Sequence, residues 1–189
     1  TCKSFNSAIT ITGLAHERQP LPNAQVMIRD ASGRQLHTKT NALGIYRIST
    51  NVLTLPLLVS VTAQGKAEDC ANNSRLRPIC MAALVTHTSA NNNLVANINP
   101  LTDRVVSDIA VSKGFIGPQQ WVDANSIGTV EAKTINNALT SLRGGFSAAL
   151  IEAGISDVAE FDPATFAMTD TSPITGIFAL LHHNRNYDN

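Results

Sequence analysis

The sequence has no excess of charge of either sign. Lysine plus arginine and aspartate plus glutamate each number 14, and charged residues make up only 15% of the 189-residue chain. Proteins that bind nucleic acids usually take much of their affinity from a basic excess. We therefore expect no nucleic-acid partner. Thr, Ser, Asn and Ala are abundant instead, and this polar, weakly charged composition favours a periplasmic, cell-surface or secreted protein over a cytosolic one.

Long hydrophobic runs are also missing. No stretch approaches the roughly 20 apolar residues that a transmembrane helix needs. The first residues, TCKSFNS, do not show the basic segment and apolar run of a secretory signal. We expect a soluble chain from which any signal peptide has already been removed or in which none was ever present.

Cysteines are few, and two of them bracket a short polar segment. Cys70 and Cys80 lie at the ends of CANNSRLRPIC, which suits a local disulfide in an oxidising compartment. Two buried thiols or half of a metal site are the alternatives, although no CxxC pair or suitably spaced His accompanies them. Cys2 is left over. It is a candidate for bacterial lipidation, the one route to a membrane that we expect, or for an intermolecular thiol; Thr1 is not the usual residue before a lipidated cysteine.

Signatures of motif-bearing enzymes are absent as well. The sequence contains no GxSxG, GxGxxG, GxxxxGK[ST] or EF-hand loop. His16 and Glu17 open the segment HERQP, but no second His follows at the spacing of a zinc-protease helix. We expect no enzymatic activity in this chain and no cofactor, although a catalytic site built from distant residues would escape such a search.

His182 and His183 are the strongest metal candidates, and they are weak. Adjacent residues on a helix diverge by about 100°, so both side chains ligate one metal only if the helix has already ended. Solvent-facing imidazoles near a helix C-terminus are the simpler interpretation, because the helix dipole favours them there. We predict no metal site.

Aromatic residues make up only 5% of the chain, which argues against a sugar platform built from stacked rings. Trp121 is the single tryptophan, in GPQQWVDANS between two helical patterns. Tryptophan is enriched at binding hot spots, so Trp121 is a candidate for contact with a partner. The alternative is burial between a β-rich half and a helical half.

What the sequence does contain is two halves with different periods. Between residues 8 and 84, short alternating runs such as AITITGLA, AQVMIRD, RQLHTKT and LPLLVSVTA are separated by Pro, Gly, Asn and Asp. This spacing is typical of a small antiparallel sandwich. We predict an α+β chain with segregated halves, in which residues 1–7 are a tether, 8–88 a β-sandwich, 89–98 a connecting strand or linker, and 99–189 a helical domain. The short run LVANI either returns to the sandwich or joins the helices to it.

The second half has helical periodicity and three cap-and-proline starts. Asn99 and Pro100 open the first helix, and Asp162–Pro163 and Ser172–Pro173 predict two more. Between them, residues 129–154 carry one apolar stripe that ends at Gly154. Two glycines lie inside that stripe, so we expect a kinked helix, or alternatively a break into two.

Several residues of the first half resemble the carboxypeptidase-regulatory-like, transthyretin-like family of sandwich domains. The matching residues are Gly13, Ala15, Pro20, Leu21, Ala24, Val26, Ile28, Asp30, Gly33, Thr38, Thr40, Gly44, Tyr46 and Ile48. The resemblance implies a transthyretin/Ig-like Greek key. It also makes Asn41, Gly44 and Tyr46 a fold-marker turn, with Asn41 where the family usually has Asp. Such domains serve as stalks, adhesion modules and accessory domains, so the resemblance implies no single activity.

The segment LVANINPLT resembles an N-[IV]-[NT]-PLT element that follows such sandwiches in bacterial extracytoplasmic proteins. Together these features favour a non-catalytic extracytoplasmic module that acts through a protein partner or self-assembly. One alternative is the N-terminal accessory domain of a larger secreted hydrolase. Another is a periplasmic binder of small ligands or carbohydrate.

Overall fold

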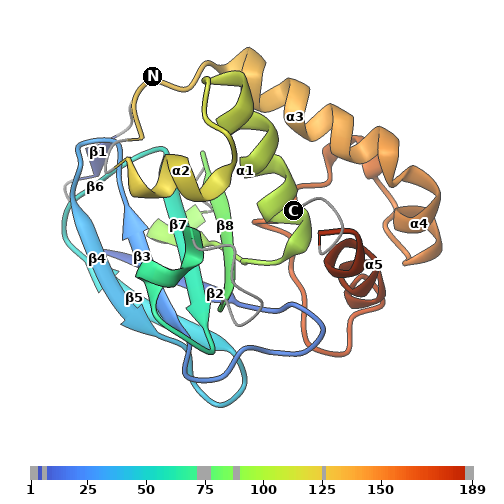
Figure 1. Cartoon of the computed structure of the whole chain (residues 1–189), viewed down its shortest axis with the longest axis horizontal. Coiled ribbons are helices and arrows are strands. Elements are labelled where there is room, and N and C mark those ends of the chain that lie inside the picture. The colour runs from blue at the N-terminus through green and yellow to red at the C-terminus, as the bar shows by residue number, and fades with distance from the viewer. Residues whose placement is uncertain (1–3, 6–7, 72–77, 87–89, 125–126, 186–189) are drawn as a thin grey trace.

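The computed structural model has two β-sheets in the first half of the chain and helices after them, an α+β arrangement (Figure 1). The structure describes residues 4–5, 8–71, 78–86, 90–124 and 127–185. The strands are β1 (Ser4–Phe5), β2 (Ile9–Leu14), β3 (Gln25–Arg29), β4 (Gln35–Lys39), β5 (Ile45–Thr50), β6 (Leu53–Thr54), β7 (Leu57–Ala63), β8 (Ile79–Val85) and β9 (Asn93–Val95). The helices are α1 (Pro100–Ser112), α2 (Pro118–Asp123), α3 (Ala132–Gly145), α4 (Ser147–Glu152) and α5 (Thr175–Arg185), with 3-10 turns η1 (Ala67–Ala71), η2 (Ala90–Asn92) and η3 (Val158–Glu160).

One sheet has the strand order β5-β2-β9 and the other β4-β3-β7-β8, and β1 pairs with β6 in a separate short ribbon. All pairs are antiparallel except β2 with β9, which run parallel with Ile11 opposite Leu94. The run LVANI therefore returns to the β-rich half.

The two larger sheets share one hydrophobic core. Ile11 from β2, Val26 from β3 and Val59 from β7 are all buried in it, together with Leu94 from β9. The alternation seen in the sequence explains this, because every second residue of a strand points to the same face. A second core lies on the outer face of the four-stranded sheet, where Leu58 and Leu84 meet the helices.

Trp121 belongs to that second core. Its side chain is 0% exposed, and its indole Nε1 donates a hydrogen bond to the Ile127 carbonyl oxygen at 3.1 Å. The alternative of an exposed partner-contact residue is therefore wrong. Burial between the strands and the helices accounts for the residue, since a buried indole N–H needs an acceptor and finds one here.

The first helix begins as its sequence predicts. Asn99 Oδ1 accepts a hydrogen bond from the Thr102 amide at 3.0 Å, and Thr102 Oγ1 accepts from the Asn99 amide at 2.9 Å, with Pro100 at the first turn. This is a reciprocal capping box. It directs α1 along β8, where Asp103 Oδ1 accepts from the Ala82 amide at 3.0 Å. Because β8 is an edge strand, this carboxylate satisfies a backbone N–H that no neighbouring strand reaches.

The turn from Asn41 to Tyr46 is held by local hydrogen bonds and by a glycine that no other residue could replace without strain. Asn41 Oδ1 accepts from the amides of Leu43 and Ile45 at 2.9 and 3.0 Å. Gly44 has φ +76°, and a Cβ there would lie 2.8 Å from the Ala15 carbonyl oxygen, so glycine is required for two reasons. Tyr46 is buried and donates from its hydroxyl to the carbonyl that follows β9, on Ala96, at 2.7 Å. Burial raises the pKa of Tyr46, which keeps the phenol a neutral donor.

The helix predictions are confirmed in part. The apolar stripe over residues 129–154 forms two helices, α3 and α4, that meet at Phe146, which is the predicted alternative of a break and not the kinked helix. The break follows directly on Gly144 and Gly145, whose helix propensity is low. Gly154 ends α4 at φ +89°, as predicted. Ser172–Pro173 opens only a turn, and α5 begins at Thr175.

Asp162–Pro163 starts no helix at all. Asp162 Oδ1 accepts from the Ala164 amide at 2.9 Å, which closes a local turn. The carbonyls that a helix would use are taken by Asn97, whose backbone N–H donates to Ala164 O at 2.7 Å and whose side-chain amide donates to Phe166 O at 2.7 Å. Tertiary hydrogen bonds therefore override the cap signal.

We expect Asp103→Ala to lower the free energy of unfolding by about 1.5–3 kcal/mol, because it leaves the Ala82 amide without its charged acceptor. Urea unfolding measures this. Asp108→Ala is the matched control: Asp108 is on the same helix and, among the described residues, its printed partner is the exposed Arg104, at 3.5 Å, so its loss changes stability by less than about 1 kcal/mol. Equal effects of the two substitutions would contradict this role for Asp103.

Candidate functional site

An open groove of about 710 Å³ lies on the outer face of the four-stranded sheet, beside the part that the helices cover. Its volume falls in the range of about 300–1,000 Å³ that is typical of ligand sites. The lining residues are Gln25, Val26, Met27, Arg29, His37, Thr38, Lys39, Ser60, Val61, Thr62, Ala67, Glu68, Gln119, Val122 and Asp123. They come from β3, β4, β7, η1 and α2.

Strand register explains the polar floor of the groove. Met27 of β3 is opposite His37 on β4 and Ser60 on β7. Gln25, two residues earlier, is opposite Lys39 and Thr62. Residues two apart share a face, so Gln25, Met27 and Arg29 all lie on the face opposite the shared core. These strand positions do not enter the core between the sheets, and they can therefore carry polar and charged side chains.

A disulfide ties one wall of the groove to the sheet. Cys70 at the end of η1 is bonded to Cys80 of β8, as the sequence predicts, with a Cα–Cα distance of 5.8 Å. The Thr62 hydroxyl, on the neighbouring strand, lies 3.6 Å from the Cys70 sulfur. These contacts hold η1, and with it Glu68, over the end of β7. A disulfide is compatible with an oxidising compartment.

Charges of opposite sign line the two sides of the groove. His37 and Lys39 are exposed on β4, which is the free edge of its sheet. Glu68 on η1 and Asp123 on α2 are exposed on the other side. Asp123 Oδ1 also accepts a hydrogen bond from Gln119 Nε2 at 2.8 Å. The groove thus runs from a basic side to an acidic side across β3 and β7.

Arg29 is the one buried cation of the groove lining. Its side chain is only 4% exposed. Nη1 donates to the carbonyl oxygen of Val122, which holds α2 against the sheet, and Nη2 lies 3.7 Å from the Met27 sulfur. Within the part of the chain that the structure describes, the buried Nε has no hydrogen-bond partner. Desolvation lowers the pKa of Arg29, and the nearby charge of Asp123 acts in the opposite direction.

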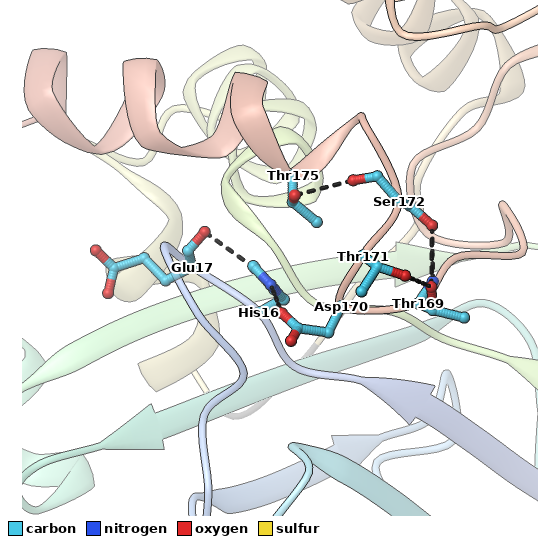
Figure 2. A network of polar contacts seen from close by, with 7 residues as sticks. All are labelled: His16, Glu17, Thr169, Asp170, Thr171, Ser172 and Thr175. Atoms are coloured by element: carbon cyan, nitrogen blue, oxygen red, sulfur yellow. Dashed lines mark hydrogen bonds and ion pairs between the residues drawn. The ribbon is translucent and has the colours of Figure 1, made fainter.

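A second polar cluster joins the two halves of the chain (Figure 2). His16, just after β2, is 1% exposed, and its Nε2 lies 2.9 Å from Oδ1 of Asp170, in the segment that precedes α5. Its Nδ1 lies 3.1 Å from the Glu17 carbonyl oxygen. The ring also contacts Phe178 of α5, with centroids 5.5 Å apart. Around Asp170, the Thr169 amide donates to Ser172 Oγ at 2.9 Å.

This cluster connects two distant segments of the chain, and neither of its printed His16 contacts is to a hydroxyl or thiol. A general base needs a ring nitrogen within hydrogen-bond reach of the group that it deprotonates. Both nitrogens of His16 instead face oxygens that only accept, a carbonyl and a carboxylate. The two contacts of the ring fasten the approach to α5 onto the end of β2.

Three other predicted site residues fall wholly or partly outside what the structure describes. His182 and His183 lie in α5, but their side chains are outside what the structure describes, as is the whole of Cys2. Among the described side chains, no three His, Cys, Asp or Glu residues gather closely enough to hold a metal ion. Within the same part of the chain, no helix combines the length and the apolar character needed to cross a bilayer.

Sequence reasoning missed the groove residues. The alternation in QVMIR and QLHTK places Arg29, His37 and Lys39 on alternate strand positions, and that pattern could have grouped them on one face. The sequence carried no signal that α2 and η1 would form the opposite wall. His16 was noticed only as an incomplete zinc motif, because its partner Asp170 is 154 residues away.

We expect His16→Ala to destabilise the protein by about 1–3 kcal/mol, because it empties a buried site and removes two polar contacts. Asp170→Ala should cost no more than about 1 kcal/mol, since Asp170 is 60% exposed and its ion pair is screened by water. Both should speed hydrogen exchange in residues 169–175, whereas the exposed Glu152→Ala should not. Unchanged exchange there in the His16 variant would contradict this connection.

We expect the double substitution Cys70→Ser, Cys80→Ser to lower stability by about 2–4 kcal/mol. Amide exchange in η1 should rise while β2 and β5 stay protected, because only the groove wall loses its covalent tie. Urea unfolding and hydrogen exchange measure the two effects. Cys2→Ser is a matched control that leaves the disulfide intact, and an η1 as protected as in the parent chain would refute the prediction.

The sequence matches no protein-family model and no curated protein. The structure shows an α+β chain with two mainly antiparallel sheets, a disulfide and an open groove with charged sides.

Proposed function

We propose that this protein is a non-catalytic extracytoplasmic binding module that acts through protein–protein contacts, with the groove as its contact surface. The observation that carries the proposal is the groove itself, which is large and open, has charged side chains at both sides, and has a floor of paired strands. A floor of hydrogen-bonded strands changes shape little on binding. The free energy that binding costs through ordering of the site is therefore smaller than for a site built from loops.

The scaffold that we propose is a transthyretin-like Greek-key sandwich of the carboxypeptidase-regulatory-like kind. The shared core between the two sheets supports it. So does the marker turn, in which Asn41 and Gly44 perform the backbone roles that the resemblance implies. In such a domain the loops and outer faces are free to bind, while the inner faces are occupied by the core.

The compartment that we propose is the periplasm, the cell surface or the exterior. The disulfide between Cys70 and Cys80 supports this placement, because such bonds persist in oxidising surroundings. Lipidation of Cys2 remains part of the proposal as the means of attachment to a membrane.

A binder of small ligands is the second candidate function. The volume of the groove, about 710 Å³, favours it, since this volume would suit a drug-sized molecule as well as a peptide segment. In that case the bound species would be a free metabolite or saccharide rather than part of a protein.

Site-specific photo-crosslinking in the native host tests the proposal. A benzophenone amino acid replaces the exposed His37 in the groove, or Ile151, which is 62% exposed on α4, as the matched control. We expect a discrete protein adduct from position 37 that position 151 does not give. Absence of any adduct at position 37, or the same adducts at both positions, would argue against a protein-binding groove and favour the small-ligand alternative.

A further inference from the structure

The groove contains a buried guanidinium, that of Arg29, which makes no ion pair within the described residues, although Asp123 lies near enough to act on its pKa. We infer that Arg29 receives a carboxylate, and that the groove takes the carboxylate-terminated end of a peptide segment carrying a basic side chain. This inference rests on the proposed function and names the chemistry of the segment that the groove would hold.

The contacts of Arg29 leave one edge of its guanidinium short of acceptors. Moving a charged group out of water is unfavourable unless hydrogen bonds and an opposite charge replace its hydration. Nη1 donates a hydrogen bond to the Val122 carbonyl oxygen. Among the described residues, Nη2 contacts the Met27 sulfur, which is a weak acceptor, and Nε has no hydrogen-bond partner. Among the described residues no ion pair involves Arg29. The Nε and Nη2 donors form the side of the fork that a carboxylate binds with two parallel hydrogen bonds.

The surroundings favour a carboxylate over a phosphate. Glu68 and Asp123 line the same groove, and Asp123 is close enough to influence the pKa of Arg29. A phosphate group with up to two negative charges would be repelled by these carboxylates more strongly than a singly charged carboxylate. Lys39 and His37 on β4 provide further donors for a single negative group.

The acidic side of the groove, formed by Glu68 and Asp123, favours a bound segment that carries a basic side chain. β4 and β7 flank β3, so the two sides of the floor are about 10 Å apart, twice the spacing of neighbouring strands. The five residues of β3 make the floor about 13 Å long. A peptide end of three or four residues fits these dimensions, and a Lys or Arg side chain on it would reach Glu68 or Asp123 while its carboxylate meets Arg29.

Affinity selection with peptide mixtures tests the inference. The purified chain with its disulfide intact is incubated with a degenerate tetrapeptide library that has free C-termini and, in equal amount, with the same library as C-terminal amides. Retained peptides are identified by mass spectrometry. We expect at least a tenfold preference for the free acids, with Lys and Arg enriched among them. Equal retention of acids and amides, or retention of neither, would overturn the inference.

Two further probes separate the sources of a carboxylate or an oxyanion. A mixture of free amino acids should be retained less than the tetrapeptides; equal retention would replace the peptide segment with a small zwitterion. Inorganic phosphate should not displace the retained peptides. Displacement at equal concentration would make the site a general oxyanion site and overturn the assignment of a carboxylate.

Variants then assign the preference to residues. Arg29→Lys keeps a cation but loses the two-donor edge. The ratio of retained free acids to retained amides should therefore fall towards one. Glu68→Gln with Asp123→Asn should keep that preference and lose the enrichment of basic residues. Lys133→Gln, an exposed charge change on α3, is the control and should alter neither. Urea midpoints close to that of the parent chain confirm that each variant is folded, and the acid–amide comparison on the parent chain stands without them.

The outcome is separable from that of the proposed function. A protein adduct at position 37 without any preference for free acids would reject this inference and leave the proposed function standing. A preference for free acids without a protein adduct would support a carboxylate site and reject the protein partner.

Discussion

The arrangement of the whole chain depends on burying the four-stranded sheet on both faces. In β7, Leu57, Val59 and Val61 enter the core between the sheets, whereas Leu58 enters the core under the helices. A strand that is apolar on both sides is stable only when both sides are covered. The helices therefore have their place determined by the outer face of β7 and β8; in Figure 1, α2 overlaps the strands while α3, α4 and α5 lie to one side of them. The two halves are joined by a shared hydrophobic interface rather than by a linker alone.

That coverage is incomplete, and the uncovered part is where the protein has its groove. Leu58, Ala82 and Leu84 attract the helices to β7 and β8, but the outer positions of β3 and β4 carry Gln25, His37 and Lys39. Burying those groups under an apolar helix would leave them without hydrogen bonds, which is unfavourable. The boundary between apolar and polar positions on one sheet face thus decides both where α1 and α2 pack and where the surface stays open.

A few polar contacts give the interface a unique geometry. Asp103 fixes α1 to the edge of β8, Arg29 fixes α2 through the Val122 carbonyl, and His16 fixes the approach to α5 through Asp170. Hydrophobic contact alone is non-directional, so it would allow each helix to slide. Hydrogen bonds from buried or edge groups specify one position. Arg29 differs from the other two because its own contacts leave an edge of the side chain unsatisfied at the groove.

The sequence alone determined the local structure. Alternation predicted the strands, the Asn99–Pro100 pair predicted the start of α1, and the spacing of Cys70 and Cys80 predicted a bond across a short loop. Each of these depends on residues near one another in the chain, whose preferences are local. Asp162–Pro163 shows the limit, since hydrogen bonds from Asn97 overrode a good cap signal. The groove, the burial of Trp121 and the pairing of His16 with Asp170 were decided only by the tertiary structure, because each depends on which distant segments the two-sided burial of the sheet brings together.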